Sequence, residues 1–165
     1  MQIKIAELLE EAGFGNYLVT FLVSMLPIVE LRLAIPMGVS MGLPVWQAAV
    51  ISVVGNLIPV PFIIAFIRVI INWMKGRSKL LTKFALWLEA KANGPKAVRI
   101  RQGEFLGLLL FVAIPLPGTG AWTGALLAAL LDIRMKRALP PIIIGVLIAA
   151  VIVSLATGGV VTLVV

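Results

Sequence analysis

Glu30 and Arg32 are the charged residues set deepest inside apolar sequence, and their types suit the binding of a charged substrate. Arginine presents forked N–H donors that match a phosphate or a carboxylate, and a glutamate removed from water suits proton uptake. The flanking Pro27 and Pro36 favour an extended or turn backbone, and in an extended backbone residues two apart share one side. We predict that Arg32 binds an anion and that Glu30 accepts a proton. The alternative is a structural pair that bonds to itself or caps unwound backbone.

A second stretch, 115–124, offers backbone and hydroxyl groups in place of charges; it reads Pro115-Leu116-Pro117-Gly118-Thr119-Gly120-Ala121-Trp122-Thr123-Gly124. Its glycines precede an apolar helical run, so the N–H groups and dipole of that helix would point into the break. Thr119 and Thr123 add hydroxyl oxygens for a substrate or sodium. The alternative is that the small residues only allow close helix packing, since 120–124 fits the GxxxG pattern.

Two further residues complete the predicted site. Pro36 suits the first position of a helix returning from the first break, which would aim a second helix N-terminus at the same volume. Asn56 either lines that cavity or bonds to carbonyls freed by Pro59 and Pro61. The candidate substrate- or ion-binding residues are therefore Glu30, Arg32, Pro36, Asn56, Pro117, Gly118, Thr119, Gly120 and Thr123.

Composition excludes most other classes of protein. At 61% hydrophobic and 13% charged residues, the chain is too apolar for a soluble domain and is predicted to be an integral membrane protein. It has no cysteine and no histidine, so thiolate metal sites, cysteine nucleophiles and the usual general base are excluded. We expect no enzyme, no metal and no cofactor beyond a coupling ion, H⁺ or Na⁺. The net charge of +7 indicates membrane orientation, with no nucleic acid as partner.

Four short apolar runs surround the two breaks. Tyr17–Val29 and Leu33–Leu43 flank the first, and Phe105–Ile114 and Ala121–Leu131 flank the second. A bilayer span needs roughly 20 residues, so paired runs of half that length predict hairpins that enter and leave the membrane on one side. Each break would lie at the tip of such a re-entrant hairpin.

Two longer runs are predicted to cross the bilayer, Val45–Trp73 and Ala138–Ala156. Trp46 and Trp73 lie about 40 Å apart along a helix, which matches the two interfacial belts of a membrane. Asn56, Pro59 and Pro61 in the middle predict a kink, and Arg68 is expected to extend to the interface.

Surface segments connect these runs. Residues 1–14 and the linker 74–103 are predicted to be amphipathic helices on the membrane surface, and the acidic N-terminus argues against a cleavable signal. Eight basic residues lie between Lys75 and Arg101, which places the linker in the cytoplasm. These charges could also recruit anionic lipid head groups, but we favour the orientation signal. The apolar segment 158–165 has no predicted place.

The two halves, 15–73 and 104–157, carry a weak internal repeat. Pro27 aligns with Pro115 at an offset of 88 residues, whereas Gly55 aligns with Gly145 at 90, so one two-residue insertion reconciles the halves. Each half would cross once, so the second starts on the opposite side. The predicted fold is a single all-α integral membrane domain over 1–165: an inverted repeat of a re-entrant helical hairpin plus a transmembrane helix. The two breaks would meet near the middle of the membrane.

The two broken motifs and Gly55-Asn56 resemble the putative small multidrug export protein family, which is similar to the DedA/VTT group of membrane proteins. The first motif runs Leu26-Pro27-Ile28-Val29-Glu30-Leu31-Arg32-Leu33-Ala34-Ile35-Pro36, and the resemblance covers roughly residues 15–155. It implies two re-entrant helices that face each other. It also implies movement of a lipid phosphate carrier or a small solute, coupled to protons or sodium.

We therefore expect a small transporter or flippase for an anionic substrate, with a lipid phosphate carrier as the leading candidate. The alternatives are a proton-coupled exporter of cationic drugs and a membrane assembly protein without transport. The expected location is the cell membrane, crossed more than once. Since two crossings enclose a polar site poorly, we also expect a homodimer, with membrane lipids as the other partners.

Overall fold

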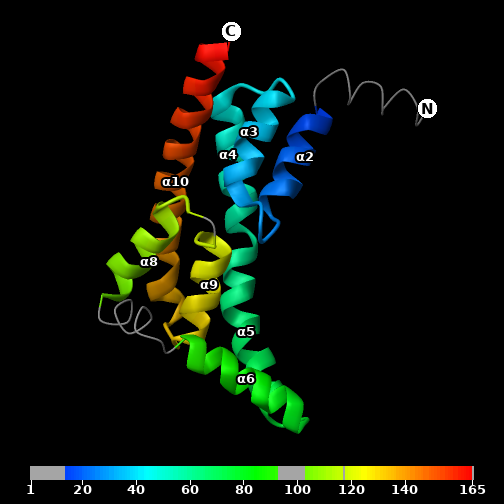
Figure 1. Cartoon of the computed structure of the whole chain (residues 1–165), viewed down its shortest axis with the longest axis vertical. Helices are drawn as coiled ribbons and strands as arrows, with labels where there is room; N and C mark the ends of the chain where they lie inside the picture. The colour runs from blue at the N-terminus through cyan, green and yellow to red at the C-terminus, as the bar shows by residue number, and fades with distance from the viewer. Residues whose placement is uncertain (1–13, 93–102, 117, 165) are drawn as a thin grey trace, which may run out of the picture. The chain divides into compact units, whose positions relative to one another are not determined.

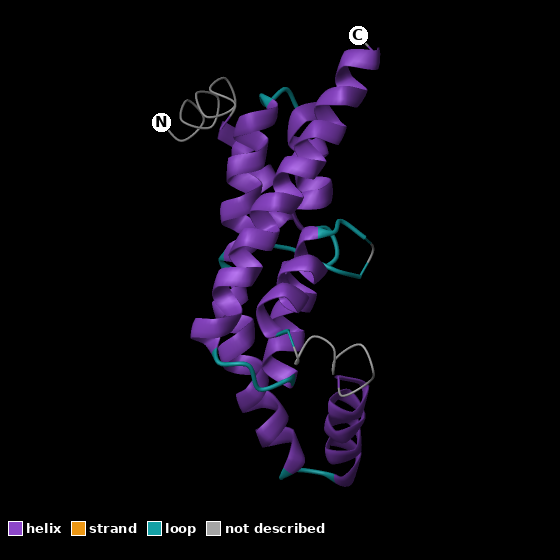
Figure 2. Cartoon of the chain, turned by 90° about the vertical axis from the view of Figure 1, so that its left-hand side faces the viewer, coloured by secondary structure: helices purple, strands orange, loops and turns teal. Residues whose placement is uncertain are grey.

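The computed structural model describes residues 14–92, 103–116 and 118–164, which form helices joined by loops, with no strand in these ranges (Figure 2). The predicted all-helical class is therefore confirmed. The chain divides into two compact units, residues 1–56 with 148–165, and residues 57–147. These units divide the chain differently from the predicted repeats at 15–73 and 104–157, and each is described by itself.

The first unit is built on a helical hairpin and the helix that follows it. Helix α2 (Phe14–Ser24) packs on α3 (Glu30–Ser40), and α4 (Val45–Leu57) comes next (Figure 1). The buried residues of α3 include Leu31, Ala34 and Ile35, an i, i+3, i+4 stripe typical of an amphipathic helix. Gly38 lets the three helices approach, because a Cβ built there would lie 2.8 Å from the Thr20 hydroxyl and 3.1 Å from Ala48 Cβ.

The second unit contains another helical hairpin, α8 (Glu104–Ala113) and α9 (Ala121–Leu130), which pack on each other. Helix α9 also packs along α5 (Pro59–Lys75), and α6 (Lys79–Ala92) contacts both (Figure 1). The buried face of α9 is made of small residues, which allow neighbouring helices to pack closely. These residues are Ala121, Gly124, Ala125, Ala128 and Ala129. The runs predicted on either side of the second break are confirmed.

Two stretches are long and apolar enough to cross a membrane, Val45–Lys75 and Met135–Val160. The first is interrupted at Ile58, where the sequence predicts a kink, because Pro59 and Pro61 cannot donate backbone hydrogen bonds. The second belongs to α10 (Met135–Val164), which carries Pro140 and Pro141 near its start. Residues 158–164, left without a place by the sequence, continue this helix.

The first break lies earlier than expected. It covers residues 25–29, and α3 already begins at Glu30 and contains Pro36 at its seventh position. The prediction that Pro36 starts the returning helix is therefore wrong. Pro36 cannot bond to the carbonyl of Arg32, but the buried stripe of α3 outweighs that loss. Pro27 ends the preceding helix because it disfavours helical backbone at the residue before it.

The turns that follow α3 and α9 share one hydrogen-bond pattern at an offset of 90 residues. Leu43 N–H donates to the Gly38 carbonyl at 3.0 Å, and Ile133 N–H donates to the Ala128 carbonyl at 2.9 Å. One position before, Gly42 has a φ of 95° and Asp132 a φ of 60°, so both turns need left-handed backbone there. Asp132 is one of the few residue types besides glycine that tolerate this.

The linker and Arg68 were predicted with different success. The helical spacing in the linker is confirmed by α6. Residues 1–13 of the predicted N-terminal helix and residues 93–102 of the linker lie outside the described residues. Arg68, which the sequence predicts to extend to the interface, has two partners that the sequence did not indicate. It donates to the Ile133 carbonyl at 2.7 Å and pairs with Asp132 at 3.1 Å, so it ties α5 to the turn after α9.

Candidate functional site

Glu30 is the most deeply buried charged residue among those that the structure describes, with 3% of its surface exposed. It opens α3 with a φ of 50°, a left-handed backbone that costs energy for any residue with a β-carbon. Its N–H donates to the Leu26 carbonyl at 3.0 Å, so the break itself holds this conformation. A buried and strained glutamate at a helix start is typical of a functional position.

Arg32 lies half-buried in the first turn of α3 and interacts electrostatically with Glu30. The prediction of extended backbone here is wrong, because both residues belong to the helix. Residues two apart on a helix are rotated by about 200° and do not face each other. Arg32 and Glu30 therefore interact through their charges at the start of the helix.

Asn56 and Ser52 are fully buried on one face of α4, four residues apart. Neither side chain has a hydrogen-bond partner: the Ser52 hydroxyl and both polar atoms of the Asn56 amide are unsatisfied. Asn56 therefore does not bond to the carbonyls freed by the prolines, which was one of its two predicted roles. Unsatisfied buried polar groups are rare and indicate a role other than stability. Ser52 was missed by the sequence prediction, although a hydroxyl one turn from Asn56 in an apolar run was a signal.

The second break is organised by its own backbone. Gly118 and Gly120 have φ values of 78° and 132°, conformations that glycine adopts without strain. The Thr119 hydroxyl lies 2.8 Å from the carbonyls of Ile114 and Leu116, so it stabilises the loop before α9. The prediction that these residues precede a helix is confirmed by α9, which begins at Ala121 and has no acid in its first turn.

The remaining predicted residues are less informative. Pro117 lies outside the described residues, and Thr123 is half-buried in α9. Gly124 supports the packing interpretation, since a Cβ built there would lie 2.7 Å from Val112 Cγ2. Among the described side chains, no group of three or more histidine, cysteine, aspartate or glutamate residues is placed to hold a metal ion.

The structure brings one set of these residues into one compact unit: Glu30, Arg32, Ser52 and Asn56. Gly118, Thr119, Gly120 and Thr123 belong to the other unit. That the two breaks form one site stays a prediction. The first set contains a buried acid, a half-buried guanidinium and unpaired hydroxyl and amide groups, and each of these groups is of a type that suits a charged ligand or an ion.

Replacing Asn56 by leucine is expected to raise thermal stability while it impairs function. Leucine has the same branching and the same number of side-chain heavy atoms, and no hydrogen bond is lost, so relief of the desolvation cost is worth about 1–3 kcal/mol. The melting temperature of the purified protein in detergent measures this, with Ser24→Ala as the control, because the Ser24 hydroxyl does donate, to the Phe21 carbonyl at 2.6 Å. A lower melting temperature for Asn56→Leu than for Ser24→Ala would contradict the assignment.

Comparison with known proteins places the chain in a family. The family model described as "Putative small multi-drug export protein" matches residues 30–152, about three quarters of the chain. The match begins at Glu30, directly after the first break, and includes the second break, the span Val45–Lys75 and most of the span Met135–Val160. Neither the curated proteins nor the solved structures gave a match to this chain.

Proposed function

Because the chain belongs to the putative small multi-drug export protein family, a kind of transporter, we propose that it moves an anionic substrate across a membrane. The leading substrate is a lipid phosphate carrier. Arg32 binds the anionic group and Glu30 accepts the coupling proton, or takes part in binding sodium. The family and the two apolar helices together indicate a membrane protein.

The observation that carries this proposal is the burial of Glu30 in strained backbone beside Arg32. A charged residue held at membrane depth is costly, and it is retained where a substrate or ion passes. Ser52 and Asn56 add uncommitted polar groups to the same unit. Their missing partners are supplied in this proposal by the substrate, the coupling ion or water.

The anionic charge of the substrate follows from the two helix starts. In α3 the N-terminal turn already contains the carboxylate of Glu30, so its dipole is partly compensated, and Arg32 supplies the positive charge. In α9 the first turn has no acid, and of the two glycines before it Gly118 is exposed and Gly120 is buried. Both features favour a negative group over a positive one.

The architecture that we propose is a pair of re-entrant hairpins in an inverted repeat. A repeat is supported by two features that recur at the same offset in both halves of the chain. The turns after α3 and α9 correspond at an offset of 90 residues, as do Gly55 and Gly145. What supports the hairpins is their length, because α2, α3, α8 and α9 have 10 or 11 residues each, about half a span.

A proton-coupled exporter of cationic compounds is the second candidate. The observation that favours it is the deeper burial of Glu30 than of Arg32, which would leave a carboxylate as the dominant charge inside the site. The family description also names drug export. Under this alternative Arg32 positions Glu30 and does not touch the substrate.

Transport in proteoliposomes with Glu30→Gln tests the proposal. We expect a pH gradient to drive movement of a fluorescent lipid phosphate by the wild type and not by Glu30→Gln, while exchange without a gradient continues in both. Asp132→Asn is the matched control, because Asp132 is an exposed acid that pairs with Arg68 in the other unit. Gradient-driven movement that persists in Glu30→Gln would overturn the role of Glu30.

The finer features of location and assembly are part of the same proposal. The basic linker faces the cytoplasm of a cell membrane that the chain crosses more than once, and the working form is a homodimer surrounded by lipid. The likeness to the DedA/VTT group concerns the two broken motifs. No enzymatic step is proposed.

A further inference from the structure

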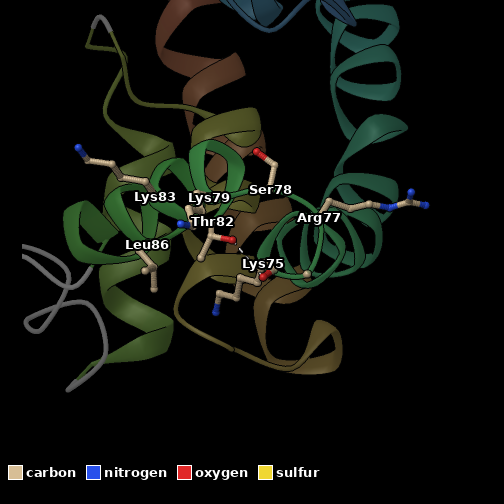
Figure 3. A pocket seen from close by; sticks show the side chains of 8 residues that line it. Lys75, Arg77, Ser78, Lys79, Thr82, Lys83 and Leu86 are labelled. Carbon is tan, nitrogen blue, oxygen red and sulfur yellow. Dashed lines mark hydrogen bonds between the residues drawn. The ribbon is translucent and has the colours of Figure 1, made fainter.

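A basic cavity lies at the corner where α5 ends and α6 begins (Figure 3). It has a volume of about 520 Å³ and is lined by Lys75, Gly76, Arg77, Ser78, Lys79, Thr82, Lys83 and Leu86. Half of these lining residues carry a positive charge, and none carries a negative one. Neither Lys79 nor Lys83 forms an ion pair with a described acid. A concave surface of this kind favours a ligand with more than one negative charge.

Hydrogen bonds within the corner hold these side chains in place. Leu80 N–H donates to the Ser78 hydroxyl at 3.2 Å, which caps the start of α6. The Thr82 hydroxyl donates to the Lys75 carbonyl at 3.0 Å and links α6 back to the end of α5 (Figure 3). The guanidinium of Arg77 lies 5.0 Å from the centre of the Trp73 ring and extends away from Lys83. The lysines therefore carry the charge that a ligand would meet.

The surroundings of the cavity identify the source of that ligand. The cavity begins at Lys75, the last residue of an apolar stretch long enough to cross a membrane. On α6, Leu80, Phe84 and Trp87 form an exposed apolar face at i, i+4 and i+7, next to the face of Lys79, Thr82, Lys83 and Leu86. Ala85 is fully buried and marks the third face, which packs on the protein. An apolar face beside a cationic face is typical of a helix in the membrane interface.

We propose that this corner binds the phosphate head group of an anionic phospholipid. Lys79 and Lys83 bind the phosphate, Lys75 adds charge from the end of α5, and the acyl chains lie along Leu80, Phe84 and Trp87. The site is separate from the substrate site of Glu30 and Arg32, which belongs to the other compact unit. It serves to fix the end of α5 at the membrane surface and does not depend on what is transported.

The test is a titration of the purified full chain in detergent with dioctanoyl phosphatidic acid, dioctanoyl phosphatidylcholine and inorganic phosphate. Intrinsic tryptophan fluorescence is the readout, because Trp73 and Trp87 flank the site. Each lysine near an anionic head group is worth about fivefold in affinity, so Lys79→Gln/Lys83→Gln should bind phosphatidic acid at least about tenfold more weakly. Lys79→Arg/Lys83→Arg should keep the affinity of the wild type.

Two control variants separate this site from other sources of binding. Arg134→Gln/Lys136→Gln removes the same charge from exposed positions outside the cavity, and should change the affinity little. Arg32→Ala should leave binding at the corner intact, so failure of the transport proposal and failure of this one are distinguishable. Circular dichroism checks that each variant is folded.

Four outcomes would overturn the proposal. An equal loss of affinity for phosphatidic acid in Lys79→Gln/Lys83→Gln and in Arg134→Gln/Lys136→Gln would indicate diffuse charge attraction. Binding lost only in Arg32→Ala would place the lipid at the substrate site. Inorganic phosphate that binds as tightly as phosphatidic acid would exclude a lipid in favour of a free phosphate. Equal affinity for phosphatidylcholine would exclude a role for the net negative charge.

Discussion

Alanine in place of Gly55 is expected to destabilise the protein by about 3 kcal/mol, one of the largest effects of any single methyl group in this chain. A Cβ built at Gly55 collides with the Ser24 hydroxyl and lies 2.7 Å from the Phe21 carbonyl oxygen. Ser24 can rotate, but a backbone carbonyl of α2 cannot move unless the whole helix moves. The new methyl group would therefore push α2 away from α4 and open the packing of the first unit.

Gly145 provides an independent measurement of the same geometry. A Cβ there would lie 2.8 Å from Val112 Cβ and 3.0 Å from the Leu109 carbonyl oxygen, so Gly145→Ala should cost about 2–3 kcal/mol. Gly15→Ala is the control, because nothing lies within 4 Å of that added carbon and alanine favours a helix by about 1 kcal/mol. Melting temperatures in detergent compare the three. Gly55→Ala as stable as Gly15→Ala would show that α2 and α4 pack less closely.

The same pair of glycines explains how much of the fold could be predicted from sequence. Gly55 and Gly145 were found as repeat markers, and the structure gives the reason, since each admits the backbone of the helix that opens its hairpin. The contacts at Gly55 come from Phe21 and Ser24, and those at Gly145 from Leu109 and Val112. Phe21 and Ser24 precede Leu109 and Val112 by 88 residues, whereas Gly55 precedes Gly145 by 90. The two-residue insertion inferred from the prolines therefore falls after the first helix of each hairpin.

What could not be predicted depends on competition between local and tertiary effects. Because proline suits the first position of a helix, the sequence predicts that α3 starts at Pro36. Burial of Leu31, Ala34 and Ile35 instead keeps Pro36 inside that helix. Likewise the position of Arg68 predicts a side chain that extends to the interface, whereas its carbonyl partner at Ile133 is 65 positions away in the chain. No pattern within one helix reveals such a partner.

Glutamine in place of Arg32 is expected to abolish high-affinity binding of an anionic lipid phosphate at the substrate site of Glu30 and Arg32. Loss of one partner of a desolvated charged contact costs about 2–5 kcal/mol, which is about thirtyfold or more in affinity. Arg32→Lys keeps the charge but loses the forked geometry, so an intermediate affinity is expected. If the substrate is cationic, the result is opposite, and Arg32→Gln should strengthen binding of a cationic dye because a repulsive charge is removed.

Stability and binding have to be separated in this experiment, because Glu30 is buried and Arg32 is its electrostatic partner. Removing only Arg32 leaves an uncompensated buried carboxylate, which costs about 3–5 kcal/mol when the pair is fully buried and less at this half-buried arginine. Glu30→Gln/Arg32→Gln removes both charges and should regain much of the lost melting temperature without regaining anion affinity. The titration belongs in the Lys79→Gln/Lys83→Gln background, where the proposed head-group site is weakened at least about tenfold, so that tight saturable phosphatidate binding reports on the substrate site. Binding in that background that is unchanged by Arg32→Gln would show that Arg32 has only a structural role beside Glu30.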